Sequence, residues 1–189
     1  DPERPGFVEY LAPDGTPELG ELRTVLVTAR LTYVFSHAHL LGVPGALAAA
    51  RHGIAFLTGA CRRADGRYSH SCTAQGEPVD GRSDFYDLAF VLFALGWYAK
   101  ASDDQSVLAL AGEVMDFLER ELAHPAGGFR EDTLDTQPRR QNPHMHLLEA
   151  CHALAAVSPD PRWLATADKL VVLMRERMLD GNGTLGEFF

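Results

Sequence analysis

The sequence contains a weak internal repeat. A short stretch that combines glycine with an aromatic residue recurs as PGFVEYLAPDGTP, DGRYSHSCTAQGEP and GGFREDTLDTQP, and a weaker fourth copy reads NGTLGEFF. With Phe7, Tyr68, Phe129 and Leu185 as reference points, the copies are separated by 61, 61 and 56 residues. A repeat of this length indicates a fold that uses one supersecondary unit several times.

Between these stretches, apolar residues recur with a helical period, and Gly, Pro, Asp and Asn mark the ends of the segments. The pattern predicts three pairs of helices, at about 20–41 and 46–62, 84–101 and 104–123, and 140–156 and 161–178. Within a pair the first helix is the more apolar, as in FYDLAFVLFALGWYA, whereas the second has a charged face, as in EVMDFLERELAH. First helices should therefore lie inside and second helices outside.

Residues 1–189 are thus expected to form a single all-α domain of αα-hairpins, arranged as a closed or curved double layer. Strands should be few. The repeated stretches are the places for short extended hairpins, since FVEYLAPDG alternates between apolar and polar residues and ends in Asp-Gly.

Composition excludes several classes of function. The net charge is −9 and no cluster of Lys and Arg is long enough to follow a phosphate backbone, so nucleic acid is not expected as a partner. No apolar run approaches the roughly 18 residues that a membrane span needs, and DPERPGFVEY does not resemble a signal peptide, so we expect a cytoplasmic protein. Three cysteines without CxxC spacing favour neither disulfides nor a zinc site, and no phosphate-binding glycine motif calls for a nucleotide cofactor.

Polar residues interrupt the apolar inner helices at matching places. Arg30, Tyr86 and Asn142 fall in the first helices of three successive repeats, and His146 follows Asn142 by four residues, on the same helical face. Burying such groups without partners would cost about 1–3 kcal/mol each. They should therefore either satisfy one another or line a site for a polar ligand.

The segments TARLTYVFSHA, FYDLAFVLFAL, GGFRE and NPHMHLLEA, in this order and with this spacing, resemble the N-acylglucosamine 2-epimerase family, which includes mannose isomerases, sulfoquinovose isomerase and cellobiose 2-epimerases. The N-x-x-M-H-x-x-E-A core is the most specific part of the resemblance. It implies an (α/α)6 barrel with a sugar bound at one end of the inner helices. Members are about twice this long, so the resemblance places the chain in the N-terminal half of such a barrel.

The resemblance further implies sugar contacts from Arg30, Tyr86, Asn142 and His146. Arg30 would bind oxygens near C1 and C2 and stabilise an enediolate, while Tyr86 and Asn142 would bind ring or hydroxyl oxygens. His146 would contact the anomeric region and act as the catalytic group that helps open the ring. The family's main acid/base histidines belong to the C-terminal half, and no cofactor or metal is implied.

Structural roles remain open for these residues. Arg30 can be a paired structural cation, Tyr86 an ordinary core aromatic, and Glu149 either a partner that orients Arg30 or His146 or simply part of a salt bridge. His144 and His146 point to different faces of their helix, which argues against a metal site and makes His144 a packing residue. The other six histidines are assigned no role.

Two classes of function follow. The first is an isomerase or epimerase that moves a proton between C1 and C2 of an aldose such as mannose, with N-acylglucosamine or disaccharide 2-epimerisation as an alternative. The second is a helical scaffold or incomplete gene product that binds a partner on its concave face. Half a barrel would leave two apolar edges, so pairing with a second copy or with a separate C-terminal half is expected. The sequence leaves open which sugar is used, the choice between isomerisation and epimerisation, and the oligomeric state.

Overall fold

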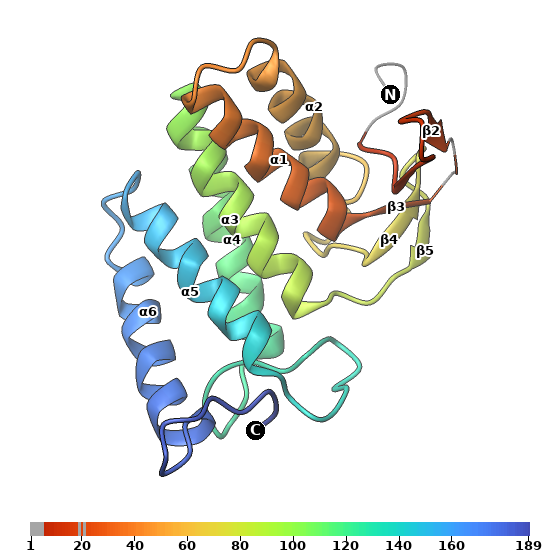
Figure 1. Ribbon diagram of the computed structural model, residues 1–189. Coiled ribbons are helices and arrows are strands. Elements are labelled where there is room, and N and C mark those ends of the chain that lie inside the picture. Colours follow the sequence, from red (N-terminus) through yellow and green to blue (C-terminus); the bar gives the residue numbers. More distant parts are fainter. Residues whose placement is uncertain (1–5, 19, 21) are drawn as a thin grey trace.

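The computed structural model describes residues 6–18, 20 and 22–189. Within this part of the chain, α-helices form three antiparallel pairs (Figure 1). The pairs are α1 (Val25–Leu40) with α2 (Ala46–Thr58), α3 (Phe85–Ser102) with α4 (Val107–Phe117), and α5 (Gln141–Ala155) with α6 (Arg162–Leu173). One-turn π-helices, Leu118–Leu122 and Met174–Met178, extend α4 and α6.

The helices α1, α3 and α5 lie side by side and run in the same direction (Figure 1). The helix α3 is in the middle and packs against both neighbours. Its sequence is apolar almost all round, and most of its residues are buried, because it also contacts α4 on its other side. The three parallel N-terminal ends therefore lie at the same end of the layer.

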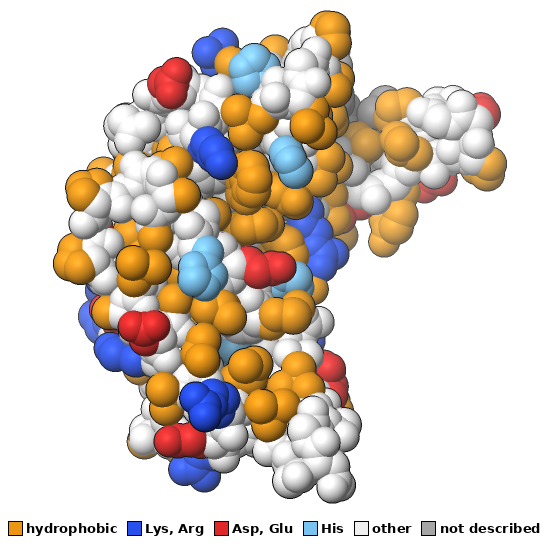
Figure 2. All heavy atoms as spheres, turned by 60° about the vertical axis from the view of Figure 1, so that its left-hand side comes forward, with side chains coloured by type: hydrophobic (Ala, Val, Ile, Leu, Met, Phe, Trp, Pro, Cys, Tyr) orange, Lys and Arg blue, Asp and Glu red, His pale blue; other side chains and the backbone are white. Residues whose placement is uncertain are grey.

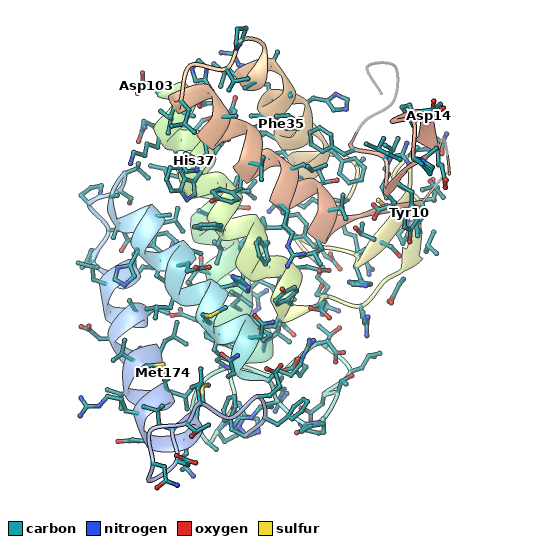
Figure 3. All side chains as sticks on the ribbon, viewed as in Figure 1. Tyr10, Asp14, Phe35, His37, Asp103 and Met174 are labelled. Carbon is teal, nitrogen blue, oxygen red and sulfur yellow. The ribbon has the colours of Figure 1, made fainter. Side chains whose placement is uncertain are left out.

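The observed helix ends differ in detail from the predicted ones. The first helix begins at Val25 and not near residue 20, because Leu22–Thr24 forms strand β3 and the Thr24 hydroxyl accepts a hydrogen bond of 3.2 Å from the Val27 backbone N–H. At the start of α3 the Asp84 carboxylate caps two backbone N–H groups. The same helix ends at Asp103, which adopts φ 57° (Figure 3).

Short strands precede the inner helices. Strand β3 pairs with β4 (Ser71–Thr73), and β4 pairs with β5 (Pro78–Asp80), in a small antiparallel sheet. A separate hairpin joins β1 (Tyr10–Leu11) to β2 (Pro17–Glu18), with Asp14 in its turn (Figure 3). Because β3 leads directly into α1 and β5 leads towards α3, the sheet helps to hold the N-terminal ends of these two helices in place.

The internal repeat appears as one turn used three times. After α2, α4 and α6 the chain closes an antiparallel bridge between residues six apart, at Arg62 and Tyr68, Ala123 and Phe129, and Leu179 and Leu185. Each turn has a glycine with positive φ, at 82° for Gly66, 88° for Gly127 and 81° for Gly183. The equivalence of Tyr68, Phe129 and Leu185 is thereby confirmed. The matching bridge partner of Phe7 would fall among residues 1–5, outside the described residues.

One face of the molecule is rich in hydrophobic side chains, with histidines among them (Figure 2). A groove of about 400 Å³ between α3 and α5 is lined by Phe93, Trp97, Glu149 and His152. Within the described part of the chain, no helix combines the length and apolar character that crossing a lipid bilayer requires.

Candidate functional site

The N-terminal ends of α1, α3 and α5 carry the four residues expected to contact a sugar. Arg30 lies in the second turn of α1, Tyr86 in the first turn of α3, and Asn142 and His146 in the first two turns of α5. The parallel inner helices bring these turns to one end of the layer (Figure 1).

Three of the four residues meet directly. Arg30 donates a hydrogen bond of 2.6 Å from Nη2 to the Tyr86 hydroxyl. The ring of Tyr86 stands edge-on to that of His146, with ring centres 5.3 Å apart. Phe90 forms the floor of the cluster, since its ring centre lies 4.5 Å from the Arg30 guanidinium carbon and 4.5 Å from the His146 ring centre. Arg30 is nevertheless exposed, so its remaining donors face solvent.

His146 is held in one orientation by Glu149. Its Nδ1 donates to the Glu149 Oε2 at 2.7 Å, which leaves Nε2 available to a ligand. Glu149 thus pairs with His146 and not with Arg30. One turn earlier on α5, Asn142 has a buried Oδ1 without a hydrogen-bond partner among the described residues. A buried amide oxygen in this state is suited to receive a hydroxyl donor.

His144 has a structural place. Its side chain is 3% exposed, its Nδ1 lies 2.9 Å from the Arg140 carbonyl oxygen, and its Nε2 accepts a hydrogen bond of 3.0 Å from the Phe129 backbone N–H. Burial, which disfavours the charged ring, lowers the pKa of His144 to about 4. The two histidines of α5 therefore do not share a site, and no group of three or more potential metal ligands gathers anywhere in residues 6–18, 20 and 22–189.

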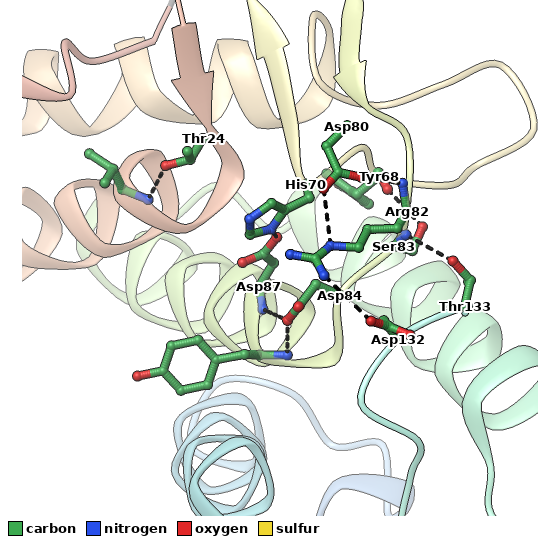
Figure 4. Close-up of polar contacts among 12 residues, drawn as sticks. Thr24, Tyr68, His70, Asp80, Arg82, Ser83, Asp84, Asp87, Asp132 and Thr133 are labelled. Carbon is green, nitrogen blue, oxygen red and sulfur yellow. Dashed lines mark hydrogen bonds and ion pairs between the residues drawn. The ribbon is translucent and has the colours of Figure 1, made fainter. Parts of the chain in front are cut away.

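A polar cleft of about 440 Å³ adjoins this cluster, and Tyr86 lines it. In the same cleft, the His70 Nδ1 and the Asp87 Oδ2 are 2.7 Å apart (Figure 4). His70 is partly exposed, whereas the Asp87 side chain is 2% exposed, and its Oδ1 has no partner among the described residues. Burial raises the pKa of Asp87 to about 6, and the hydrogen bond to Asp87 raises the pKa of His70.

Residues that form ion pairs also line the cleft. The carboxylate of Glu131 accepts hydrogen bonds of 2.6 Å from both the backbone N–H and the Nε of Arg140. Arg82 pairs with Asp80 at 3.1 Å and with Asp132 at 3.6 Å (Figure 4). Both guanidinium groups are thus already engaged with carboxylates.

Sequence reasoning missed the residues of this cleft. Asp87 could have been found as a charged residue within the apolar stretch FYDLAFVLFAL, where burial without a partner would be unfavourable. His70 had been assigned no role, because it lies 17 positions before Asp87, in a repeated turn-rich stretch with no local pattern to mark it.

Comparisons with known proteins identify the family of the chain. Residues 6–189 match the family described as N-acylglucosamine 2-epimerase (GlcNAc 2-epimerase). A mannose-6-phosphate isomerase of Rhizobium meliloti (strain 1021) is 32% identical over 195 residues, which cover all of this chain and 50% of that protein. A D-mannose isomerase of Thermobifida fusca is 33% identical, over 75% of this chain and 36% of that protein.

The solved structure of cellobiose 2-epimerase from Spirochaeta thermophila DSM 6192 superposes with a TM-score of 0.90 and 28% identity, covering all of this chain and 51% of that one. The αα-hairpins are thus those of an (α/α)6 barrel, of which about half is present. The chain spans about half the length of these relatives. It belongs to the N-acylglucosamine 2-epimerase family.

Proposed function

We propose that this chain forms the substrate-binding half of a sugar isomerase or 2-epimerase, with Arg30, Tyr86, Asn142 and His146 as its sugar contacts. The observation that carries the proposal is the cluster in which Arg30 bonds Tyr86 and Tyr86 packs against His146, at the one end of the layer where three inner helices begin. Polar groups from three separate repeats thus converge where a ligand can meet all of them at once.

The reaction proposed for the site begins with opening of the sugar ring to give the open-chain aldose. In ring opening, the O1 hydroxyl loses its proton, the bond between C1 and the ring oxygen breaks, and that oxygen gains a proton. We assign one of these proton transfers to His146, whose free Nε2 is oriented by the bond from Nδ1 to Glu149. A histidine of the C-terminal half of the barrel, which the family resemblance implies, would accept the C2 proton. Arg30 would stabilise the resulting enediolate through donors that keep their positive charge.

The outcome of the reaction depends on where the proton returns. Reprotonation at C1 converts an aldose to a ketose, and reprotonation of the other face at C2 gives the epimer. Relatives carry names of both kinds, D-mannose isomerase and cellobiose 2-epimerase. We favour an unmodified aldose such as mannose as substrate, with N-acylglucosamine or a disaccharide as the alternative.

Sugar binding by the 189-residue chain tests the proposal directly. Ligand-observed NMR with D-mannose should detect binding in the millimolar range, and Tyr86→Phe and His146→Asn should each weaken it. The asparagine amide can keep the bond to Glu149 while removing the nitrogen that faces the ligand.

The matched control is Tyr98→Phe, which removes a hydroxyl from another largely buried tyrosine of α3, three turns from Tyr86. Binding in this variant should equal that of the unaltered chain. If the two site variants bind mannose as well as Tyr98→Phe does, the proposed site is wrong.

A further inference from the structure

The cleft that Tyr86, His70 and Asp87 line has the features of a second part of the binding site. Its volume of about 440 Å³ falls within the range of about 300–1,000 Å³ that small-molecule pockets occupy. Tyr86 belongs to both regions, because it lines the cleft and also accepts the hydrogen bond from Arg30. A ligand held by Arg30 and His146 at one end would therefore extend past Tyr86 into the cleft.

Two groups in the cleft have a polar atom without a hydrogen-bond partner among the described residues. The Asp87 side chain is almost completely enclosed, yet only its Oδ2 is bonded, to His70, and its Oδ1 has no partner among the described residues. Among the described residues no hydrogen bond involves the Nε2 of His70, whose side chain is 28% exposed and lines the cleft. An imidazole whose one nitrogen is fixed by a buried carboxylate presents the other in a defined direction.

The charges around the cleft select the kind of ligand. Four carboxylates line it, those of Asp84, Asp87, Glu131 and Asp132. The two guanidinium groups, of Arg82 and Arg140, are already paired with carboxylates. A phosphate would meet no free guanidinium there and would face the field of the carboxylates, whereas a sugar hydroxyl can both donate and accept.

We propose that His70, held by Asp87, is a substrate-binding residue. It contacts hydroxyl groups of the sugar that lie away from the reacting C1 and C2. This inference rests on the proposed function, since that function places the reacting end at Arg30 and His146. The cleft then favours an unphosphorylated sugar over its 6-phosphate.

Paired substitutions of one residue test this role. His70→Asn keeps a donor near the position of Nδ1 for Asp87 but removes the nitrogen that faces the cleft, whereas His70→Gln places an amide near the position of Nε2. We expect His70→Asn to weaken D-mannose binding about tenfold, the effect of losing one hydrogen bond, and His70→Gln to retain most of the affinity. Mannose 6-phosphate should bind the unaltered chain more weakly than mannose.

The control is His52→Gln, which changes another partly buried histidine that makes one hydrogen bond, to the Gly6 carbonyl oxygen, outside the cleft. It should bind mannose normally. Three results would each overturn the inference: unchanged mannose binding by His70→Asn, equal losses of affinity in His70→Asn and His52→Gln, or tighter binding of mannose 6-phosphate than of mannose. A loss of mannose binding in Tyr86→Phe would still uphold the proposed function in each of these cases. Absence of mannose binding by the unaltered chain would instead overturn the proposed function, and the role of His70 with it.

Discussion

Protonation of His144 should lower the stability of the folded protein in mild acid. Its neutral ring joins the start of α5 to the preceding turn, because it bonds both the Arg140 carbonyl oxygen and the Phe129 backbone N–H. The second of these bonds needs an unprotonated Nε2. Protonation would therefore remove an acceptor and place a charge in a site that is 3% exposed.

The pKa of His144 sets the pH range and the size of the effect. It falls from an ordinary value of 6.5 to about 4 in the folded protein. Above pH 6.5 the ring is neutral in both states and contributes no pH dependence. As the pH falls below that value, only the unfolded chain takes up the proton, so stability declines until the folded ring also protonates near pH 4. The expected loss of unfolding free energy is about 2 kcal/mol between about pH 7 and pH 5, and about 3 kcal/mol by about pH 4.

Urea denaturation followed by circular dichroism, repeated across this pH range, measures the effect. His144→Gln supplies a neutral amide that can both donate and accept, so the variant should be less stable near pH 7 yet show a shallower decline in acid. The difference between the two curves isolates His144 from His70 and Asp87, whose raised pKa values favour the folded state as the pH falls. The control is His152→Gln, an exposed site on α5. Parallel curves for the unaltered protein and His144→Gln would refute this account.

Three further predictions concern activity, binding and stability. The isolated 189-residue chain should exchange the C2 proton of mannose at least about 10²-fold more slowly than a complete family member. The reason is that the reaction needs a base and an acid, whereas the chain supplies one well-placed histidine. Full exchange activity that is abolished by His146→Ala would contradict this prediction. Glu149→Gln should weaken mannose binding by about threefold to tenfold, since the charge that orients His146 is lost, and unchanged NMR titrations would show that Glu149 has no such role. Gly128→Ala should lower the free energy of unfolding by about 1–3 kcal/mol, because φ is +70° and the new Cβ would lie 2.6 Å from the His144 Nε2. Gly181→Ala, which meets nothing within 4 Å, is its control in thermal denaturation, and equal melting temperatures would disprove the packing argument.

The helix pairs were predictable because apolar residues recur along them with a helical period, most continuously in α3, and a single sequence displays that pattern. The start of the first helix was predicted too early. Apolar residues such as Leu22 and Val25 continue the helical pattern towards the N-terminus, but pairing of β3 with β4 determines the backbone there. Local periodicity cannot register a hydrogen-bond partner that lies about fifty residues away.

The residues of the candidate site were likewise predictable only in part. Asn142, His146 and Glu149 lie within eight positions of one helix, so a sequence motif can mark them together. The pairing of His70 with Asp87 joins a turn to a helix through an ion pair of 2.7 Å, and neither residue type is unusual in its own segment. Only the fold reveals that a nearly enclosed carboxylate and a partly exposed imidazole share one cleft.

The hydrogen bond between Arg30 and Tyr86 joins two different hairpins, and His146 comes from a third. On the proposed assignment no single repeat holds the ligand, and binding is thermodynamically linked to the docking of α1 and α5 on α3. A sugar that needs all three helices in register must stabilise their association by as much as their association strengthens its binding. Substitutions deep between the helices, far from any ligand atom, can then tune affinity by altering how firmly the hairpins are docked.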